Sequence, residues 1–161
     1  MRNFLLTLIA IFFVSCSSDN VILAEPTSDN EIKKENKETA NAMTINITID
    51  NVTREVMLVD NVATQALFTK LHEGPITLSL NTNGNFEIWG ALGFSLPTAN
   101  EYINGQPGDV VLYSGSNICI FYGTNSYSYT RLGKIGGLSA DELKTFLKGG
   151  QNNITVKLSL P

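Results

Sequence analysis

The sequence predicts a mainly β fold, a closed eight-stranded antiparallel barrel with two short helices, and three observations predict it. Several short segments alternate apolar and polar residues with a period of two, which is typical of half-buried strands. Two segments have helical spacing together with start and stop signals. About eight strands in one small domain would expose edges unless the sheet closes, and two helices can cover the open ends of the closed sheet.

The domain is expected to begin with a hairpin of two strands. Residues Thr44–Ile49 alternate strictly, Asp50–Asn51 form a turn pair, and Thr53–Val59 return as the second strand. A helix should follow, with Asp60 as its cap. Its apolar residues fall on one stripe at helical spacing: Val62, Ala63, Ala66, Leu67 and Leu71.

The middle of the domain contains a second hairpin and a long connection. After Gly74–Pro75 ends the helix, Ile76–Leu80 alternate again, and Asn83–Gly84 is a strong hairpin signal with Phe86–Trp89 as the partner strand. Residues 90–108 are punctuated by Gly, Pro, Asn and Ser, so we expect a long loop or several turns. Loops of this length in compact domains are often functional.

The last part of the domain carries further short strands and the second helix. Strands are predicted at Asp109–Tyr113, Ile118–Tyr122, near Tyr129–Ile135, and at the end of the chain at Asn153–Leu160. Ser139 and Glu142 have the spacing of a capping box, which marks the start of a helix. Its apolar face is predicted to consist of Ala140, Leu143, Phe146 and Leu147, with Gly149–Gly150 as its stop.

The N-terminus has the pattern of a secretion signal. The apolar run Phe4–Val14 follows one basic residue, Arg2, and is too short to span a bilayer. Phe13-Val14-Ser15-Cys16 resembles the lipobox of bacterial lipoproteins, in which the cysteine becomes the lipidated N-terminus. The alternative is an ordinary signal peptide in which Cys16 is incidental. We predict a signal peptide at 1–15, a lipidated N-terminus and flexible charged tether at 16–42, and the barrel domain at 43–161.

The lipid on Cys16 would make the membrane a partner and place the protein in the cell envelope. Ser17, rather than Asp, after the cysteine favours the outer membrane. Which face of the membrane carries the domain, and its oligomeric state, stay open. Cleavage would remove Arg2 and no acidic residue, changing the formal charge from -4 to -5. Since no basic stripe is visible, nucleic acid is not an expected partner.

Catalytic and metal-binding patterns are absent from the sequence. It has one histidine, His72, at the end of the first predicted helix, and no cluster of His and Cys for a transition metal. Cys119 lies in an apolar run, where a buried, unreactive thiol is the expected state. No phosphate-binding loop or Gly-x-Ser-x-Gly elbow occurs. We therefore predict no cofactor, no metal site and no catalytic residue.

Several segments resemble the bacterial cyclophilin-like family. They are Leu96–Pro97, Gly105–Tyr113, Phe121–Gly123 and, as the most specific part, Ser128–Ile135, and the resemblance covers Met43–Leu160. It implies a cyclophilin-like eight-stranded barrel with two helices. True cyclophilins isomerise prolyl peptide bonds with an arginine in an aromatic groove, and carry Phe-His-Arg and Phe-x-x-Gln motifs. Both motifs are missing here.

These observations favour a non-catalytic module that binds a small molecule or a peptide. A divergent prolyl isomerase, and an interaction or structural module in an envelope complex, are the alternatives. Arg131 is a candidate for contacting a ligand, and an ion pair with Asp109 or Glu87 is the structural alternative. Aromatic residues flank the 90–108 segment and a predicted turn at 123–126, and would form a cleft if the two meet. The candidate ligand-binding residues are Trp89, Phe94, Tyr122, Tyr127, Tyr129 and Arg131, although packing is the alternative for the aromatics.

Overall fold

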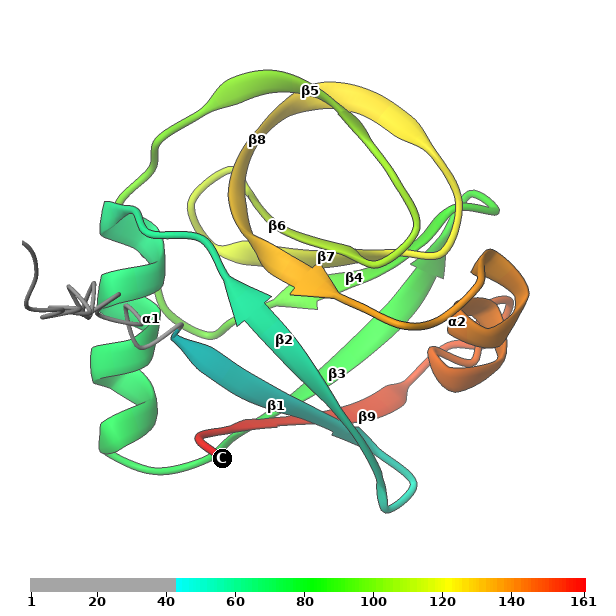
Figure 1. Ribbon diagram of the computed structural model, residues 1–161, viewed down its shortest axis with the longest axis horizontal. Coiled ribbons are helices and arrows are strands. Elements are labelled where there is room, and N and C mark those ends of the chain that lie inside the picture. The colour runs from blue at the N-terminus through cyan, green and yellow to red at the C-terminus, as the bar shows by residue number, and fades with distance from the viewer. Residues whose placement is uncertain (1–42) are drawn as a thin grey trace, which may run out of the picture. The chain divides into compact units, whose positions relative to one another are not determined.

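The computed structural model describes residues 43–161, so the predicted signal peptide, Cys16 and the tether lie outside the described residues. The described part contains nine strands and two helices (Figure 1). In chain order they are β1 (Thr44–Ile49), β2 (Val52–Leu58), α1 (Val62–His72), β3 (Ile76–Asn83), β4 (Glu87–Ala91), β5 (Glu101–Gly105), β6 (Asp109–Tyr113), β7 (Asn117–Phe121), β8 (Asn125–Ile135), α2 (Ala140–Phe146) and β9 (Ile154–Ser159).

Eight of the strands close into an antiparallel barrel, in the order β2-β1-β9-β3-β4-β7-β6-β8, and the pairing of β2 with β8 closes it. At this seam Gly133 lies opposite Leu58, and a side chain there would collide with the backbone oxygen of Met57. The predicted eight-stranded barrel with two helices is confirmed. The ninth strand, β5, pairs with β8 alone.

One large apolar cluster fills the barrel. Alternate residues of the strands point into it, as β6 illustrates with Val110 and Leu112 and β7 with Ile118 and Ile120. Both helices add leucines to the same cluster: Leu67 and Leu71 from α1, and Leu143 from α2 with Leu147 directly after it. Figure 1 shows the two helices on opposite sides of the barrel. They therefore help to close it, as predicted.

The long connection at 90–108 differs from the prediction because it contains β5. This strand has one partner and exposes residues such as Glu101 and Tyr102, so its sequence lacks the apolar alternation of a barrel strand. β8 is also longer than predicted and starts at Asn125, where the sequence indicated a turn at 123–126. Its polar first half is stabilised as a strand by pairing with β5.

The two helix starts show one correction and one confirmation. Asn61, and not Asp60, caps α1, because its Oδ1 accepts from the backbone N–H groups of Ala63 and Thr64. Val62, predicted to face the core, is exposed. At α2 the capping box is confirmed: Ser139 Oγ accepts from Glu142 N, and Glu142 Oε2 accepts from Ser139 N at 2.7 Å. The Ser139 backbone N–H and the Ser139 hydroxyl both donate to Glu142 Oε2, and these two hydrogen bonds lower the pKa of the Glu142 carboxyl. Within residues 43–161, no helix is long and apolar enough to cross a membrane.

Candidate functional site

A second, smaller apolar cluster lies on the opposite face of the strands that enclose the barrel interior. On β6, Val110 and Leu112 face inward while Val111 faces this outer cluster, and on β7 Cys119 and Phe121 do the same. β5 and the first half of β8 curve over β6 and β7 in Figure 1. The outer cluster consists of the buried residues Ile103, Val111, Cys119, Phe121 and Tyr129, with Phe86, Trp89 and Tyr113 partly buried against them.

A cavity of about 290 Å³ opens at the side of this outer cluster, and we call it the aromatic pocket. Its walls come from the β3–β4 hairpin, from β6 and β7, and from the first half of β8. Its volume is at the lower end of the range of small-molecule sites. The lining residues are Asn83, Glu87, Trp89, Tyr113, Cys119, Asn125, Tyr127 and Tyr129.

Glu87 is the one carboxylate in this lining, and it is only 3% exposed. The β3–β4 hairpin places it directly opposite Asn83, whose Nδ2 donates to Glu87 Oε1 at 2.8 Å. Within residues 43–161, Glu87 Oε2 has no hydrogen-bond partner. A buried charged atom without a partner is costly, and native proteins rarely keep one without a reason.

Burial raises the pKa of the Glu87 carboxyl above its ordinary value. The Asn83 amide, which donates to Oε1, offsets this effect in part, and the nearby Cys119 thiol lowers the pKa to a smaller extent. The Glu87 carboxyl therefore takes up a proton at a higher pH than an exposed glutamate does. A ligand that donates to Oε2 would stabilise its ionised form.

Three tyrosine rings form the aromatic side of the pocket. The ring centroids of Tyr113, Tyr127 and Tyr129 lie 5.7 to 6.1 Å apart, in edge-to-face arrangements. Asn125 Nδ2 donates to Tyr129 Oη at 2.9 Å, and burial raises the pKa of Tyr129 to about 12. The Tyr129 ring is therefore held in place as a neutral phenol. Tyr127 is about half exposed at the pocket mouth, where a ligand can reach it.

Cys119 is a free, buried thiol beneath the pocket, as predicted from its apolar neighbours. Burial raises the pKa of the Cys119 thiol, and the charge of Glu87 raises it further. Because the thiolate is the reactive form of cysteine, this environment keeps Cys119 from acting as a nucleophile at neutral pH. Its role in the pocket is that of a small apolar wall.

The structure brings three of the six predicted ligand-binding residues, Trp89, Tyr127 and Tyr129, together in the aromatic pocket. Phe94 packs instead against the barrel-interior cluster, and the Lys70 ammonium lies 6.0 Å from its ring centroid. Tyr122 is buried in that same interior cluster beside α2, with Lys144 over its ring. The two loops predicted to meet therefore do not place all their aromatic residues at one site.

Arg131 lies outside the aromatic pocket and takes part in ion pairs. Its Nε is 2.7 Å from Glu101 Oε1 on β5, and its Nη1 is 3.8 Å from Asp109 Oδ2. Lys134 Nζ also approaches Asp109, at 3.2 Å. The predicted alternative, an ion pair between Arg131 and Asp109, is therefore observed, and Glu101 is an additional partner. Glu87, the other predicted partner, lies in the aromatic pocket. The pairs tie β5, β6 and β8 together.

Sequence reasoning missed Asn83, Glu87, Tyr113, Cys119 and Asn125 as pocket residues. One signal was available for Glu87: in the predicted strand Phe86–Trp89 it is two residues from Trp89, so both side chains share a face. The position of Tyr113 opposite Asn117, which brings β6 to the same site, depends on strand register. No local pattern in the sequence encodes that register.

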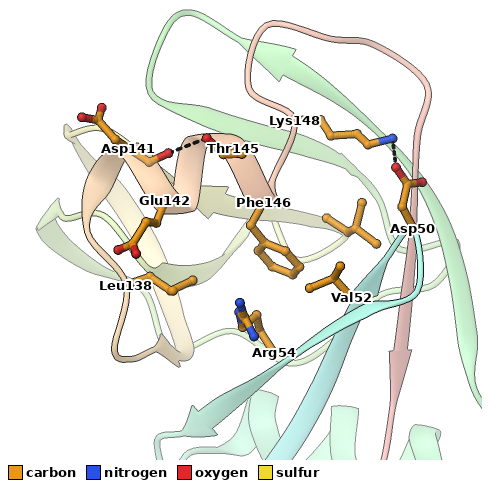
Figure 2. Close-up of a pocket in the computed structure, with 10 residues that line it drawn as sticks. Asp50, Val52, Arg54, Leu138, Asp141, Glu142, Thr145, Phe146 and Lys148 are labelled. Carbon is orange, nitrogen blue, oxygen red and sulfur yellow. Dashed lines mark hydrogen bonds and ion pairs between the residues drawn. The ribbon is translucent and has the colours of Figure 1, made fainter.

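A larger cavity of about 510 Å³ lies between the tip of the β1–β2 hairpin and α2, and we call it the α2 groove (Figure 2). Figure 2 shows Arg54 beside Phe146, and the guanidinium carbon lies 5.8 Å from the ring centroid. Lys148 forms an ion pair with Asp50 at one edge of the groove. The groove is lined by Ile49, Asp50, Val52, Arg54, Leu138, Asp141, Glu142, Thr145, Phe146 and Lys148.

The polar groups of the α2 groove are exposed or bonded within the protein. Glu142 accepts from the backbone N–H of Ser139 in the capping box of α2, and Thr145 Oγ1 donates to the Asp141 carbonyl at 2.9 Å. Among the described residues, the groove lining contains no buried polar atom without a partner, in contrast to Glu87 Oε2 in the aromatic pocket. The smaller cavity is therefore the better candidate site, since its lining includes a buried carboxylate whose Oε2 has no partner among residues 43–161.

A sequence-family comparison identifies the fold. A model of the cyclophilin-like family matches residues 47–159, nearly the whole described domain. The chain belongs to the cyclophilin-like family. A search of curated proteins finds no match to it.

Among solved structures, this cyclophilin-like chain is similar to the hypothetical protein AF2241 from Archaeoglobus fulgidus, with a TM-score of 0.58 and 20% sequence identity. The alignment covers 78% of this chain and 99% of the archaeal chain. At this identity the similarity shows a shared fold, and the chemistry of the cyclophilin-like domain has to be argued from its own residues.

Proposed function

We propose that this protein is an envelope-anchored lipoprotein whose cyclophilin-like barrel binds a small molecule in the aromatic pocket. One observation carries the binding proposal: the pocket is lined by a buried carboxylate whose second oxygen has no partner within residues 43–161. Aromatic side chains with a few polar groups are the usual composition of a small-molecule site. The cavity is present without a ligand, and a small movement of the surrounding side chains would bring the buried Oε2 into contact with it.

The fluorescence of one residue can report on binding in the aromatic pocket. Trp89 is its single tryptophan, and it lines the aromatic pocket. A ligand that enters the pocket should therefore change the intrinsic fluorescence of the protein, while a ligand in the α2 groove should not. Titration of the purified full chain with a library of small molecules, read by Trp89 emission and melting temperature, tests the proposal. It fails if every compound that raises the melting temperature leaves Trp89 emission unchanged.

The anchoring proposal rests on the lipobox-like Phe13-Val14-Ser15-Cys16 and has its own test. The chain has two cysteines, Cys16 and Cys119, and they allow a matched pair of variants. In a bacterial host fed a labelled fatty acid, Cys16→Ala should lose the label and leave the membrane fraction, whereas Cys119→Ala should keep both. Label that persists in Cys16→Ala would contradict lipidation at this residue.

Prolyl isomerisation, the chemistry of true cyclophilins, has no specific support in this geometry. Arg131, which the sequence offered as a ligand-contact candidate, has its guanidinium paired with Glu101 and Asp109. These partners would have to be released before Arg131 could polarise a peptide carbonyl. A protease-coupled assay of X-Pro exchange, which is slow without a catalyst, is expected to show no acceleration.

A further inference from the structure

We propose that the ligand of the aromatic pocket carries a positively charged amine, which donates to Glu87 Oε2 while its carbon skeleton packs on the tyrosine and tryptophan rings. This inference rests on the proposed binding function and deepens it by naming the chemical class of the ligand. Three properties of the pocket support it: its charge, its vacant hydrogen-bonding capacity and the electrostatics of its rings.

The charge of the lining has one sign. Of the eight lining residues, Glu87 is the one acid, and no Lys, Arg or His is among them. The other titratable groups in the lining are the Cys119 thiol from β7 and the phenols of Tyr113, Tyr127 and Tyr129 from β6 and β8. Tyr122, outside the lining, lies close enough to Glu87 to respond to its charge. Thiols and phenols are neutral at pH 7. An anionic ligand would therefore meet an uncompensated carboxylate in a low-dielectric site.

The hydrogen-bonding capacity points the same way. Asn83 satisfies Oε1, and the side chain offers Oε2 as a pure acceptor when it is ionised. An ammonium group has three donors and no acceptor, so it matches a lone carboxylate oxygen. Hydrogen bonds in which both partners are charged are about twice as strong as neutral ones.

The aromatic rings add a second attraction for a cation. Tyrosine and tryptophan rings are negative on their faces, and a cation within about 6 Å of the ring centre is attracted to them. Three tyrosines and one tryptophan surround a cavity whose single charged group is negative. Carboxylate and rings together form the kind of environment that binds alkylammonium groups. The volume of about 290 Å³ restricts the ligand to a small amine.

The test compares three probes in which the same phenylethyl group carries a different polar end: 2-phenylethylamine, 2-phenylethanol and 3-phenylpropionate, which are cationic, neutral and anionic at pH 7. Each is titrated into the full chain in detergent, and Trp89 emission is followed. The amine should bind on the order of tenfold more tightly than the alcohol, because a charged hydrogen bond and cation–π attraction both favour it. The anion should bind most weakly.

Glu87→Gln separates the carboxylate from the rings. This variant should lose about tenfold in affinity for the amine and leave the affinity for the alcohol nearly unchanged, since a neutral amide keeps the shape but not the charge. Glu87→Asp, which keeps the charge, should recover part of the amine affinity. Glu55→Gln, the same substitution at an exposed site on β2, should leave all three titrations unchanged. Melting curves establish that each variant is folded.

The outcomes distinguish the two proposals. If the alcohol or the anion binds as tightly as the amine, or if Glu87→Gln leaves amine affinity unchanged, the amine inference is overturned and the binding function stands. If no probe of any charge changes Trp89 emission, the aromatic pocket is not a binding site for such molecules and both proposals are overturned. Selective, Glu87-dependent binding of the amine supports both.

Discussion

The aromatic pocket and the α2 groove are two cavities of one barrel, and they differ in how their polar groups are satisfied. The larger α2 groove is bordered by an ion pair, a helix cap and a guanidinium over a ring, so its charges serve the fold. The smaller aromatic pocket contains a buried carboxylate oxygen that nothing within residues 43–161 satisfies. An unsatisfied buried group is a better sign of function than cavity volume, because the fold bears its cost.

The largest expected difference between the two cavities is in the unfolding free energy lost when an aromatic side chain is removed. Tyr129 is only 4% exposed and packs on the rings of Tyr113, Tyr127 and Phe121, so Tyr129→Ala should lower the free energy of unfolding by about 3–5 kcal/mol. Phe146→Ala in the α2 groove removes a partly buried ring and should cost about 1–2 kcal/mol. Guanidinium unfolding of both variants checks this order. A larger loss in Phe146→Ala would mean that the groove is the better-packed site.

Glu87→Gln should stabilise the free protein at neutral pH, by about 1 kcal/mol, because a buried amide costs less than a buried carboxylate with one unpaired oxygen. Glu87→Gln is therefore expected to gain folding stability and to lose affinity for the amine. Asp141→Asn in the α2 groove should not stabilise the protein, since Asp141 is exposed and its charge is favourable in the first turn of α2. Loss of stability in Glu87→Gln at pH 7 would show that the carboxylate is satisfied after all.

The pH dependence of this difference has a definite sign. The folded state raises the pKa of Glu87 above its unfolded value, so the folded protein holds the proton more tightly. Relative to Glu87→Gln, wild-type stability is therefore greatest at acid pH. The stability of the wild type relative to the variant falls as the pH rises from the unfolded carboxyl pKa, about 4.3, to the raised pKa of the folded state. Above the folded pKa this difference stays constant. Denaturant melts of both proteins from pH 4 upward measure this; a difference that grows in the opposite direction would contradict the raised pKa.

The smallest effect is expected at the ion pair at one edge of the α2 groove. The Asp50 side chain is 65% exposed, so Lys148→Ala should lower the free energy of unfolding by less than about 1 kcal/mol, and added salt should reduce that loss. Trp89 emission and amine affinity should not change. An effect of Lys148→Ala on Trp89 would show that the two cavities are coupled.

The sequence could predict those parts of the fold that depend on local patterns. Period-two alternation identified the barrel strands, and the Ser139–Glu142 spacing identified the start of α2, because both are local patterns. β5 escaped prediction because an extra strand paired on one side and exposed on much of its surface needs no apolar alternation. Asp60 and Asn61 are both good caps, and only the path of the backbone decides between them.

The candidate site was predictable only in part, for a related reason. The aromatic residues near the turn at 123–126 indicated Tyr127 and Tyr129, and Trp89 followed from its flanking loop. Glu87 and Tyr113 join them through the registers of β4 with β7 and of β6 with β7, which depend on long-range pairing. Arg131 is the opposite case. It lies in the segment that most resembles the family and was predicted to contact a ligand, but it pairs with Glu101 and Asp109, which come from two other strands.

The most direct test of the central claim is a carbon-13 NMR titration of the Glu87 carboxyl group, with and without 2-phenylethylamine, using Glu87→Gln to assign its signal. In the free protein the pKa of Glu87 should lie above the ordinary carboxyl value, since burial raises it. With the amine bound, the pKa should fall, because the ammonium group stabilises the ionised carboxylate. A Glu87 pKa that is ordinary in the free protein, or that the amine leaves unchanged, would contradict the claim that this carboxylate is the ligand-binding group of the domain.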